Sequence, residues 1–410
     1  MPQNDLLAGY RTAVGRLAGF SGDAGGQAAF GFLIIALAAR ASELEAFGTF
    51  AFTLALVGLQ APLGVFGLRA LIYSRVAARR TGRHRLISIA FWSCLPLSCL
   101  LYLGSVFIIL SLGQQDLALL YSFCGLKVLA APAQIILADH EARYAIRDYV
   151  PLRIASISFA SLAAVWLFMA GEGVEAMALV WGGESVLFAL ALWAATLKRV
   201  RMPRALWMRQ RALFYKAAPL AIQTVFVVLY LRFDQIYVQL RFGQAELAIY
   251  AAAARIAEAG NLAFGIVVLM LTPYLIREAV DGSLSRRSFV ALVAIAAATL
   301  FASFSALFFG AAVLRTIFGA PYQPGQTILA IYILSTAFVA YSSMASRIAT
   351  SLGATGVSAL TAAAGAAANI VLSIALGELM GPAGVAGATV LSYALVVALL
   401  VSYLKVRSKR

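Results

Sequence analysis

Seven ionisable side chains lie inside apolar stretches of this sequence, where a charge is costly. They are Asp23, Lys127, Glu184, Arg232, Asp234, Arg255 and Glu258. A charge at the middle of a bilayer costs about 2.5 kcal/mol or more, so intramembrane ionisable residues are functional candidates by default. Guanidinium and ammonium groups bind phosphate oxygens, whereas carboxylates bind protons or Na⁺. The residue types therefore predict an anion-binding site and a coupling-ion site.

We assign the two roles by charge. The candidates for anion binding along a substrate pathway are Arg255, Lys127, Arg232 and Arg69. The candidates for coupling-ion binding are Asp234, Glu258, Asp23 and Glu184. Arg69 ends an apolar stretch, so it can instead act as an anchor at the cytoplasmic surface, as can Arg347.

Arg255 and Glu258 are three residues apart on one predicted helix, so they share a face and can neutralise each other. A structural ion pair facing the helix bundle is therefore an alternative to a role in transport. Gly260 and Asn261 follow at once, and the length of this stretch suggests a bend there. Bent helices near the midplane commonly line transporter sites.

The other intramembrane charges also have two interpretations each. Arg232 and Asp234 are two residues apart, so they cannot both face one cavity directly. Asp23 lies among small residues that permit close helix approach, or near the cytoplasmic mouth of a pathway. Lys127 and Glu184 are isolated charges, and each can contact a ligand or pair with a charge in the other half of the chain.

The composition shows which elements must carry these side chains. Of 410 residues, 62% are hydrophobic and only 12% are charged, with mean hydropathy +0.90 and net charge +15. In a typical soluble domain, about a quarter of the residues are charged. This chain is therefore predicted to be an all-α integral membrane protein, and the composition excludes a disordered chain, a disulfide scaffold and a cytosolic enzyme.

Apolar windows of suitable length predict about twelve transmembrane helices. Their approximate residue ranges are 17–39, 47–68, 87–112, 117–138, 153–170, 176–197, 217–240, 246–275, 288–314, 326–350, 355–377 and 382–404.

The 32 basic residues fall unevenly between the predicted loops. With the N-terminus inside, 26 are cytoplasmic, three are outside and three lie within spans; Arg153 is counted among the cytoplasmic ones. This bias predicts an N-in, C-in topology. Because the basic residues lie in short loops between helices, no nucleic-acid partner is expected.

The longest polar break, residues 198–216, divides the chain into two six-helix halves, 1–197 and 217–410, with a basic cytoplasmic linker between them. Two weak internal sequence similarities support a repeat. Glu45 to Ala51 is similar to Ala245 to Ala251, and Gly173 to Ala176 is similar to Gly384 to Gly387. Two six-helix halves have the same orientation, which predicts a parallel repeat around a central cavity.

Catalytic patterns are missing from the sequence. Cys94, Cys99 and Cys124 lie in apolar segments without a CxxC pair, and the two histidines lie in polar loops. We find no nucleophile triad, metal motif or nucleotide-binding motif. We therefore expect no enzymatic activity, no cofactor and no metal. The short outer loops also argue against a glycan polymerase or ligase.

Several motifs in order resemble one membrane protein family. They are Ala38-Ala39-Arg40 with Glu45-Ala46-Phe47-Gly48-Thr49-Phe50, Leu231-Arg232-Phe233-Asp234 with Gly243 to Ile256, Thr316-Ile317-Phe318-Gly319-Ala320-Pro321-Tyr322, and Asn369 with Gly381 to Thr389. They are similar to the polysaccharide biosynthesis (O-antigen-type) flippases of the multidrug, oligosaccharidyl-lipid and polysaccharide exporter (MOP) superfamily. The chain differs at Ala248, where the family has a glycine, and at Ser42-Glu43, where the family favours Leu-Gly.

The resemblance implies a transporter that moves a polyprenyl-pyrophosphate-linked oligosaccharide across the bacterial inner membrane for polysaccharide export, by alternating access. The implied partners are the lipid-linked glycan substrate, membrane lipids and other polysaccharide-export proteins. The alternative within the same fold is an ion-coupled multidrug or metabolite antiporter. Such an antiporter favours acidic over basic cavity residues, but here the intramembrane charges are nearly balanced.

Overall fold

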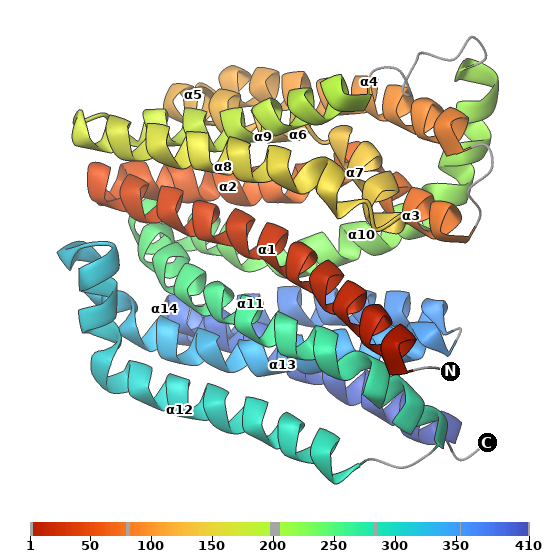
Figure 1. Ribbon diagram of the computed structural model, residues 1–410. Helices are drawn as coiled ribbons and strands as arrows, with labels where there is room; N and C mark the ends of the chain where they lie inside the picture. Colours follow the sequence, from red (N-terminus) through yellow and green to blue (C-terminus); the bar gives the residue numbers. More distant parts are fainter. Residues whose placement is uncertain (1–2, 79–82, 197–205, 282–284, 353, 409–410) are drawn as a thin grey trace. The chain divides into compact units, whose positions relative to one another are not determined.

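The computed structural model describes residues 3–78, 83–196, 206–281, 285–352 and 354–408. Figure 1 shows these residues as helices joined by short turns, without strands. In chain order they are α1 (Gln3–Ala41), α2 (Leu44–Val65), α3 (Leu68–Ala78), α4 (Arg83–Ser111), α5 (Gln115–Cys124), α6 (Leu126–Leu129), α7 (Ala133–Ala142), α8 (Ile146–Met169), α9 (Val174–Thr196), α10 (Leu206–Phe242), α11 (Gln244–Asp281), α12 (Arg286–Ile317), the short 3₁₀ helix η1 (Ala320–Gly325), α13 (Gln326–Ser351) and α14 (Thr355–Ser408).

Nine helices in the described part of the chain are long and apolar enough to cross a membrane, or ten if the bent pair formed by α5–α6 and α7 is one broken span. The chain is therefore a multi-pass membrane protein. Large apolar side chains remain exposed along these helices, as at Phe107 on α4, Trp166 on α8 and Phe301 on α12, and lipid tails can cover them. The number of twelve spans and the N-in, C-in orientation stay predictions.

The last helix, α14, is too long for one crossing. Its candidate span, Gly356–Val406, has 51 residues and would extend about 75 Å, against about 30 Å of hydrocarbon. Gly381 has φ 65° and ψ −151°, and Pro382 follows it, so the regular helix is interrupted there. The interruption lies between the predicted spans 355–377 and 382–404.

Two other predicted segments differ from the structure. The predicted span 117–138 is divided into α5, α6 and α7, with breaks near Gly125 and Pro132. Residues 69–78, expected in a loop, instead form most of α3. A sharp turn at Phe66 and Gly67, both with positive φ, ends α2 and allows α3 to start in a new direction.

The chain divides into two compact units. The first contains Met1–Ala41 and Leu56–Val225, and the second contains Ser42–Ala55 and Phe226–Arg410. The start of α2 belongs to the second unit: the Phe47 and Tyr322 rings are perpendicular, with their centroids 5.5 Å apart, and Gly48 packs against the Gln244 backbone. Residues 198–205 of the predicted linker 198–216 lie outside the described residues, and the rest belongs to the beginning of α10.

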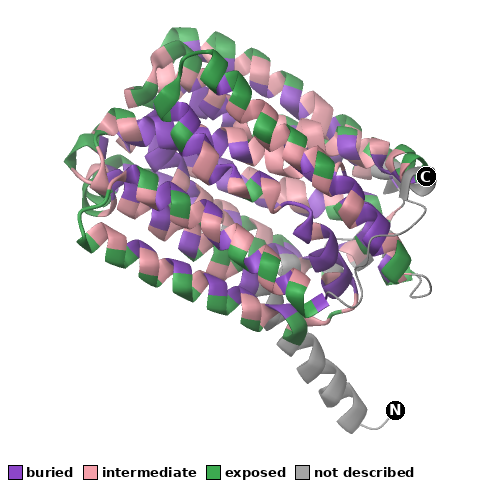
Figure 2. Cartoon of the chain, turned by 90° about the horizontal axis from the view of Figure 1, so that it is seen from above, coloured by how far each residue is buried: buried purple, intermediate pink, exposed green. Residues whose placement is uncertain are grey.

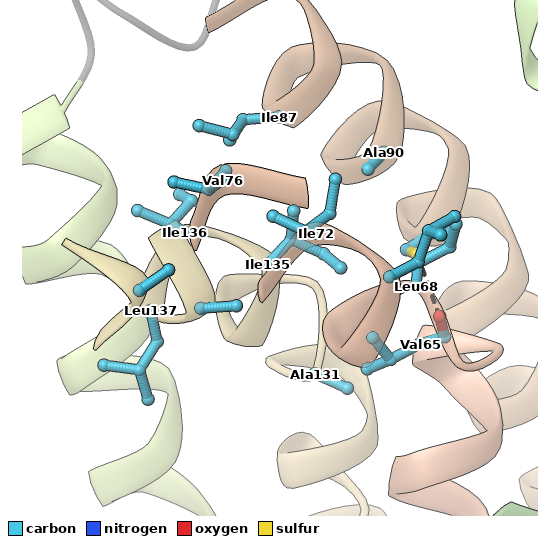
Figure 3. Packing of buried hydrophobic residues seen from close by; sticks show 14 of the residues in the cluster. Val65, Leu68, Ile72, Val76, Ile87, Ala90, Ala131, Ile135, Ile136 and Leu137 are labelled. Carbon is cyan, nitrogen blue, oxygen red and sulfur yellow. Dashed lines mark hydrogen bonds between the residues drawn. The ribbon is translucent and has the colours of Figure 1, made fainter. Parts of the chain in front are cut away.

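Burial follows the helix faces. Figure 2 shows buried, half-buried and exposed residues alternating along the helices, as expected where one side packs on a neighbouring helix. One cluster in the first unit joins α3, α4 and α7 through aliphatic side chains, among them Leu68, Ile72, Ile87 and Ile135 (Figure 3). We call this set the α3–α4–α7 core. It also contains Leu213 and Ala217 of α10.

Candidate functional site

Three buried charges meet in the first unit, contributed by α1, α8 and α9. Arg153 Nε lies 3.3 Å from Asp23 Oδ1, and Arg153 Nη1 lies 3.4 Å from Glu184 Oε1. Ser156, one turn after Arg153 on α8, donates a 2.8 Å hydrogen bond to the same Glu184 oxygen. The Arg153 guanidinium also lies 3.3 Å from the centre of the Phe188 ring. Each of the three charged side chains is at least nine-tenths buried.

This first cluster contains more acid than base. Two carboxylates face one guanidinium, so the cluster carries one net negative charge when both acids are ionised. Uncompensated charge is costly in a buried site. A proton or a small cation would neutralise the excess, which gives the cluster the chemistry expected of a coupling-ion site.

The position of Arg153 corrects a sequence-based assignment. The sequence predicts a cytoplasmic position for Arg153, because its charge lowers the hydropathy at the start of the predicted span 153–170. In the structure α8 begins at Ile146, so Arg153 lies two turns inside the helix and is buried. The helical spacing of Arg153 and Ser156 was the signal that could have identified it. Glu184 thus pairs within its own unit and not with the other half of the chain.

Arg69 and Lys127, two of the predicted anion-binding residues, each have a partner of their own in the first unit. Arg69, at the start of α3, donates hydrogen bonds of 3.0 and 2.9 Å to the two carboxylate oxygens of Glu141 on α7. The Lys127 Nζ lies 4.3 Å from the centre of the Trp181 ring, a cation–π contact between α6 and α9. Within the first unit, Arg69 and Lys127 thus bind different partners, a carboxylate and an aromatic ring.

The other two predicted cations do come together, in the second unit. Arg255 Nη1 donates a 2.6 Å hydrogen bond to Glu258 Oε2, and Arg232 Nη1 lies 3.5 Å from Glu258 Oε1. Arg232 comes from α10, whereas Arg255 and Glu258 are one turn apart on α11. One carboxylate thus bridges two guanidinium groups. This cluster has one net positive charge, opposite in sign to the cluster around Arg153.

The positive cluster is also less enclosed than the negative one. The side chains of Arg232, Arg255 and Glu258 are 22%, 17% and 28% exposed. A guanidinium that uses only part of its donor set on Glu258 keeps N–H groups for a second anion. The expected bend is not seen as a break, since α11 is a single helix through Gly260 and Asn261.

Asp234 lies two residues after Arg232 in the sequence and is fully buried, but its carboxylate has different partners. Its Oδ2 accepts hydrogen bonds from Tyr250 on α11 at 2.8 Å and from Tyr332 on α13 at 3.0 Å. Its Oδ1 accepts the backbone N–H of Gln235 at 2.8 Å. The carboxylate forms no ion pair with a described residue. Neither tyrosine could be assigned to Asp234 from the sequence, because both contacts join residues on different helices.

A second polar group lies in the same unit on α14. Asn369 Nδ2 donates to Ser392 Oγ at 3.1 Å and to Thr389 Oγ1 at 3.5 Å, and all three residues are buried. The Asn369 Oδ1 and Ser373 Oγ atoms, one turn apart, are buried without a hydrogen-bond partner in the described part of the chain. This arrangement holds α14 on both sides of Gly381 together through side chains.

Metal chemistry has no support in the described residues. They contain no group of three or more His, Cys, Asp or Glu side chains placed to hold a metal ion. The three cysteines are free.

Solved structures of membrane transporters share this arrangement of helices. A multidrug resistance MATE family transporter of the MOP superfamily, in an inward-facing conformation, matches with a TM-score of 0.66 at 14% identity, covering 93% of this chain and 94% of the other. The lipid II flippase MurJ, in an inward closed conformation, matches with a TM-score of 0.67 at 17% identity, covering 93% and 87%. A eukaryotic MATE transporter matches with a TM-score of 0.63 at 17% identity, covering 98% of each chain.

These likenesses show the fold alone: the described helices have the arrangement found in the two MATE transporters and in MurJ. The family model described as "Polysaccharide biosynthesis protein" matches residues 24–278, more than half of the chain. The chain therefore belongs to the polysaccharide biosynthesis protein family, which confirms the resemblance found in its sequence motifs. Among curated protein sequences, none matches the chain.

Proposed function

We propose that this protein moves a polyprenyl-pyrophosphate-linked oligosaccharide from the inner to the outer leaflet of a bacterial inner membrane. Family membership supports a step in polysaccharide synthesis. The observation that carries the substrate class is the Arg232–Glu258–Arg255 cluster, which has an excess positive charge and is partly open. A pyrophosphate group supplies the concentrated negative charge that such a pair of guanidinium groups binds.

Two buried acidic sites are available to couple transport to an ion gradient. One is Asp23 with Glu184, where two carboxylates share Arg153. The other is Asp234, which has hydroxyl and amide donors but no cationic partner among the described residues. Binding of a proton or Na⁺ at either site changes the charge of a buried group. An ion that binds one conformation more tightly shifts the equilibrium toward that conformation. This differential binding is the physical basis of alternating access here.

The cations Lys127 and Arg69 have subordinate roles in this proposal. Lys127 is partly occupied by the Trp181 ring and Arg69 by Glu141. Each can contribute to the electrostatic field that attracts an anionic substrate, and Arg69 can also anchor the protein at the cytoplasmic surface. Other polysaccharide-export proteins are the proposed partners, because they must supply and consume a lipid-linked glycan.

An ion-coupled antiporter for drugs or metabolites is the second candidate. The net negative cluster of Asp23, Arg153 and Glu184 favours it, since a buried acidic site suits a cationic cargo as well as a coupling ion. The fold is compatible with both activities, because it resembles both a MATE transporter and MurJ.

Deletion of the gene, followed by analysis of lipid-linked intermediates, separates the two candidates. A flippase defect leaves the lipid-linked oligosaccharide on the cytoplasmic face, where a membrane-impermeant enzyme or lectin added to spheroplasts cannot reach it. Unchanged surface glycans together with altered drug tolerance would instead identify the antiporter. Re-expression of the wild-type chain is the control for both results.

A further inference from the structure

A basic pocket lies in the first unit, outside both charge clusters. It has a volume of about 420 Å³ and is lined by Arg75 on α3, by Arg85, Leu86 and Ile89 on α4, and by Ala212, Leu213 and Lys216 on α10. Ligand pockets in proteins are commonly about 300–1,000 Å³, so this one is large enough for a small polar group with an apolar attachment. Three separate helices contribute one cation each.

The pocket is positively charged without compensation. No carboxylate lines it, and in the described part of the chain Arg75, Arg85 and Lys216 form no ion pair with an acid. The two acids of neighbouring α7 form ion pairs with other cations: Glu141 with Arg69, and Asp139 with Arg143. Three cations around one space repel one another unless an anion binds between them.

The apolar wall of the pocket is part of a firmly packed region. Ile89 and Leu213 are buried members of the α3–α4–α7 core, and Leu86 packs against it. Figure 3 shows Ile87 and Val76 of the same core between α3 and α4. Because all three helices pack on one core, the cations are carried by a preformed scaffold. One side of the pocket is thus charged and the other aliphatic.

The sequence indicates which side of the membrane the pocket faces. The three cations belong to the predicted cytoplasmic segments 69–85 and 198–216, which hold 13 of the basic residues. The cytoplasmic leaflet carries anionic lipids, and basic pockets between transmembrane helices on that side bind their head groups. A lipid phosphate with its glycerol and upper acyl chain combines the two chemistries that the pocket presents.

We propose that this pocket binds the phosphate-bearing head group of an anionic phospholipid from the cytoplasmic leaflet. Arg75, Arg85 and Lys216 contact the phosphate oxygens, and Leu86, Ile89 and Leu213 contact the start of an acyl chain. The site holds α3, α4 and α10 together at the membrane surface as a lipid-dependent clamp. This inference is independent of the proposed function, because it concerns a different ligand at a different place.

Native mass spectrometry of the purified full chain tests the proposal. The protein in detergent is mixed with equal amounts of phosphatidylglycerol and phosphatidylcholine, and the bound lipids are counted. The variant Arg75→Gln/Arg85→Gln/Lys216→Gln is expected to lose the preference for phosphatidylglycerol by at least about tenfold, since each surface cation contributes to anionic-lipid attraction.

A matched control removes the same charge from elsewhere on the predicted cytoplasmic side. Arg83, Arg211 and Arg347 do not line the pocket, so Arg83→Gln/Arg211→Gln/Arg347→Gln should keep the preference. Equal losses in the two triple variants would overturn the proposal, because they would indicate general surface attraction. Displacement of the lipid by excess glycerol 3-phosphate would also overturn it, in favour of a free phosphate ligand. If the triple variant of the pocket does not fold, the double variant Arg85→Gln/Lys216→Gln, which changes only exposed residues, is compared with the control for its preference for phosphatidylglycerol.

Discussion

The Nε atom of Arg153 lies 3.3 Å from Oδ1 of Asp23, so one guanidinium on α8 holds a carboxylate on α1. The same guanidinium reaches Glu184 on α9, and the Phe188 ring covers it. One buried cation therefore joins three helices of the first unit, α1, α8 and α9. The second unit has the reverse arrangement, with Glu258 between Arg232 and Arg255. Each unit contains a charged triad, and the two triads have opposite net charge.

Removal of the central cation should destabilise the first unit strongly. Arg153→Met leaves Asp23 and Glu184 buried without a counter-charge, and breaking a buried ion pair by removing one partner costs about 3–5 kcal/mol. Thermal unfolding of the purified protein in detergent measures the loss. The triple variant Asp23→Asn/Arg153→Met/Glu184→Gln should recover most of it, because no unpaired charge remains. Arg147→Met, at an exposed position on the same helix, is the control; an Arg153→Met variant as stable as Arg147→Met would refute the pairing.

Asp234 should determine the response of the protein to a coupling ion. An ion that binds the folded protein raises its stability by mass action. We expect Na⁺ or acidification to raise the melting temperature of the wild type and to have a smaller effect on Asp234→Asn, which has the same size but no charge. Asp116→Asn, at an exposed position on α5, is the matched control. An unchanged ion response in Asp234→Asn would assign coupling to the Asp23–Glu184 site instead.

Two adjacent glycines on α9 test the packing of the first unit. A Cβ at Gly182 would overlap the backbone carbonyl of Phe123, whereas a Cβ at Gly183 would meet nothing within 4 Å. Gly182→Ala should therefore destabilise the protein by about 1–3 kcal/mol, as overpacking does. Gly183→Ala should be neutral or stabilising by up to about 1 kcal/mol, because alanine is the better helix former. Equal melting temperatures for the two variants would contradict the close approach of α9 to α5.

The all-helical membrane class and the family could be predicted from the sequence, because both depend on local composition and short motifs. The pairing of Arg255 with Glu258 was also predictable, since residues three apart on a helix share a face. Helix α3 could not be predicted from the sequence in this way. Its basic residues lower the average hydropathy of the segment, although four of its apolar residues are buried: Leu68, Leu71, Ile72 and Val76.

The partners of the buried charges could be predicted only in part, since they depend on contacts between distant segments. Tyr332 lies 98 residues after Asp234 in the chain, and its hydroxyl still reaches that carboxylate. Arg153 was misplaced for a related reason: the hydropathy scale treats an arginine as polar even where two acids neutralise it inside the bundle. The pairing of Arg69 with Glu141 and of Lys127 with Trp181 likewise depends on tertiary packing.

Transport by single-charge variants in reconstituted vesicles tests the central claim most directly. The purified protein is placed in proteoliposomes containing a labelled polyprenyl-pyrophosphate-linked oligosaccharide, and the fraction that becomes accessible to an external lectin is followed over time. We predict transport by the wild type and by Arg315→Ala, which removes an exposed cation, and a loss of tenfold or more in Arg255→Ala at equal protein abundance. Transport by Arg255→Ala at the wild-type rate would contradict the assignment of the Arg232–Glu258–Arg255 cluster as the pyrophosphate site.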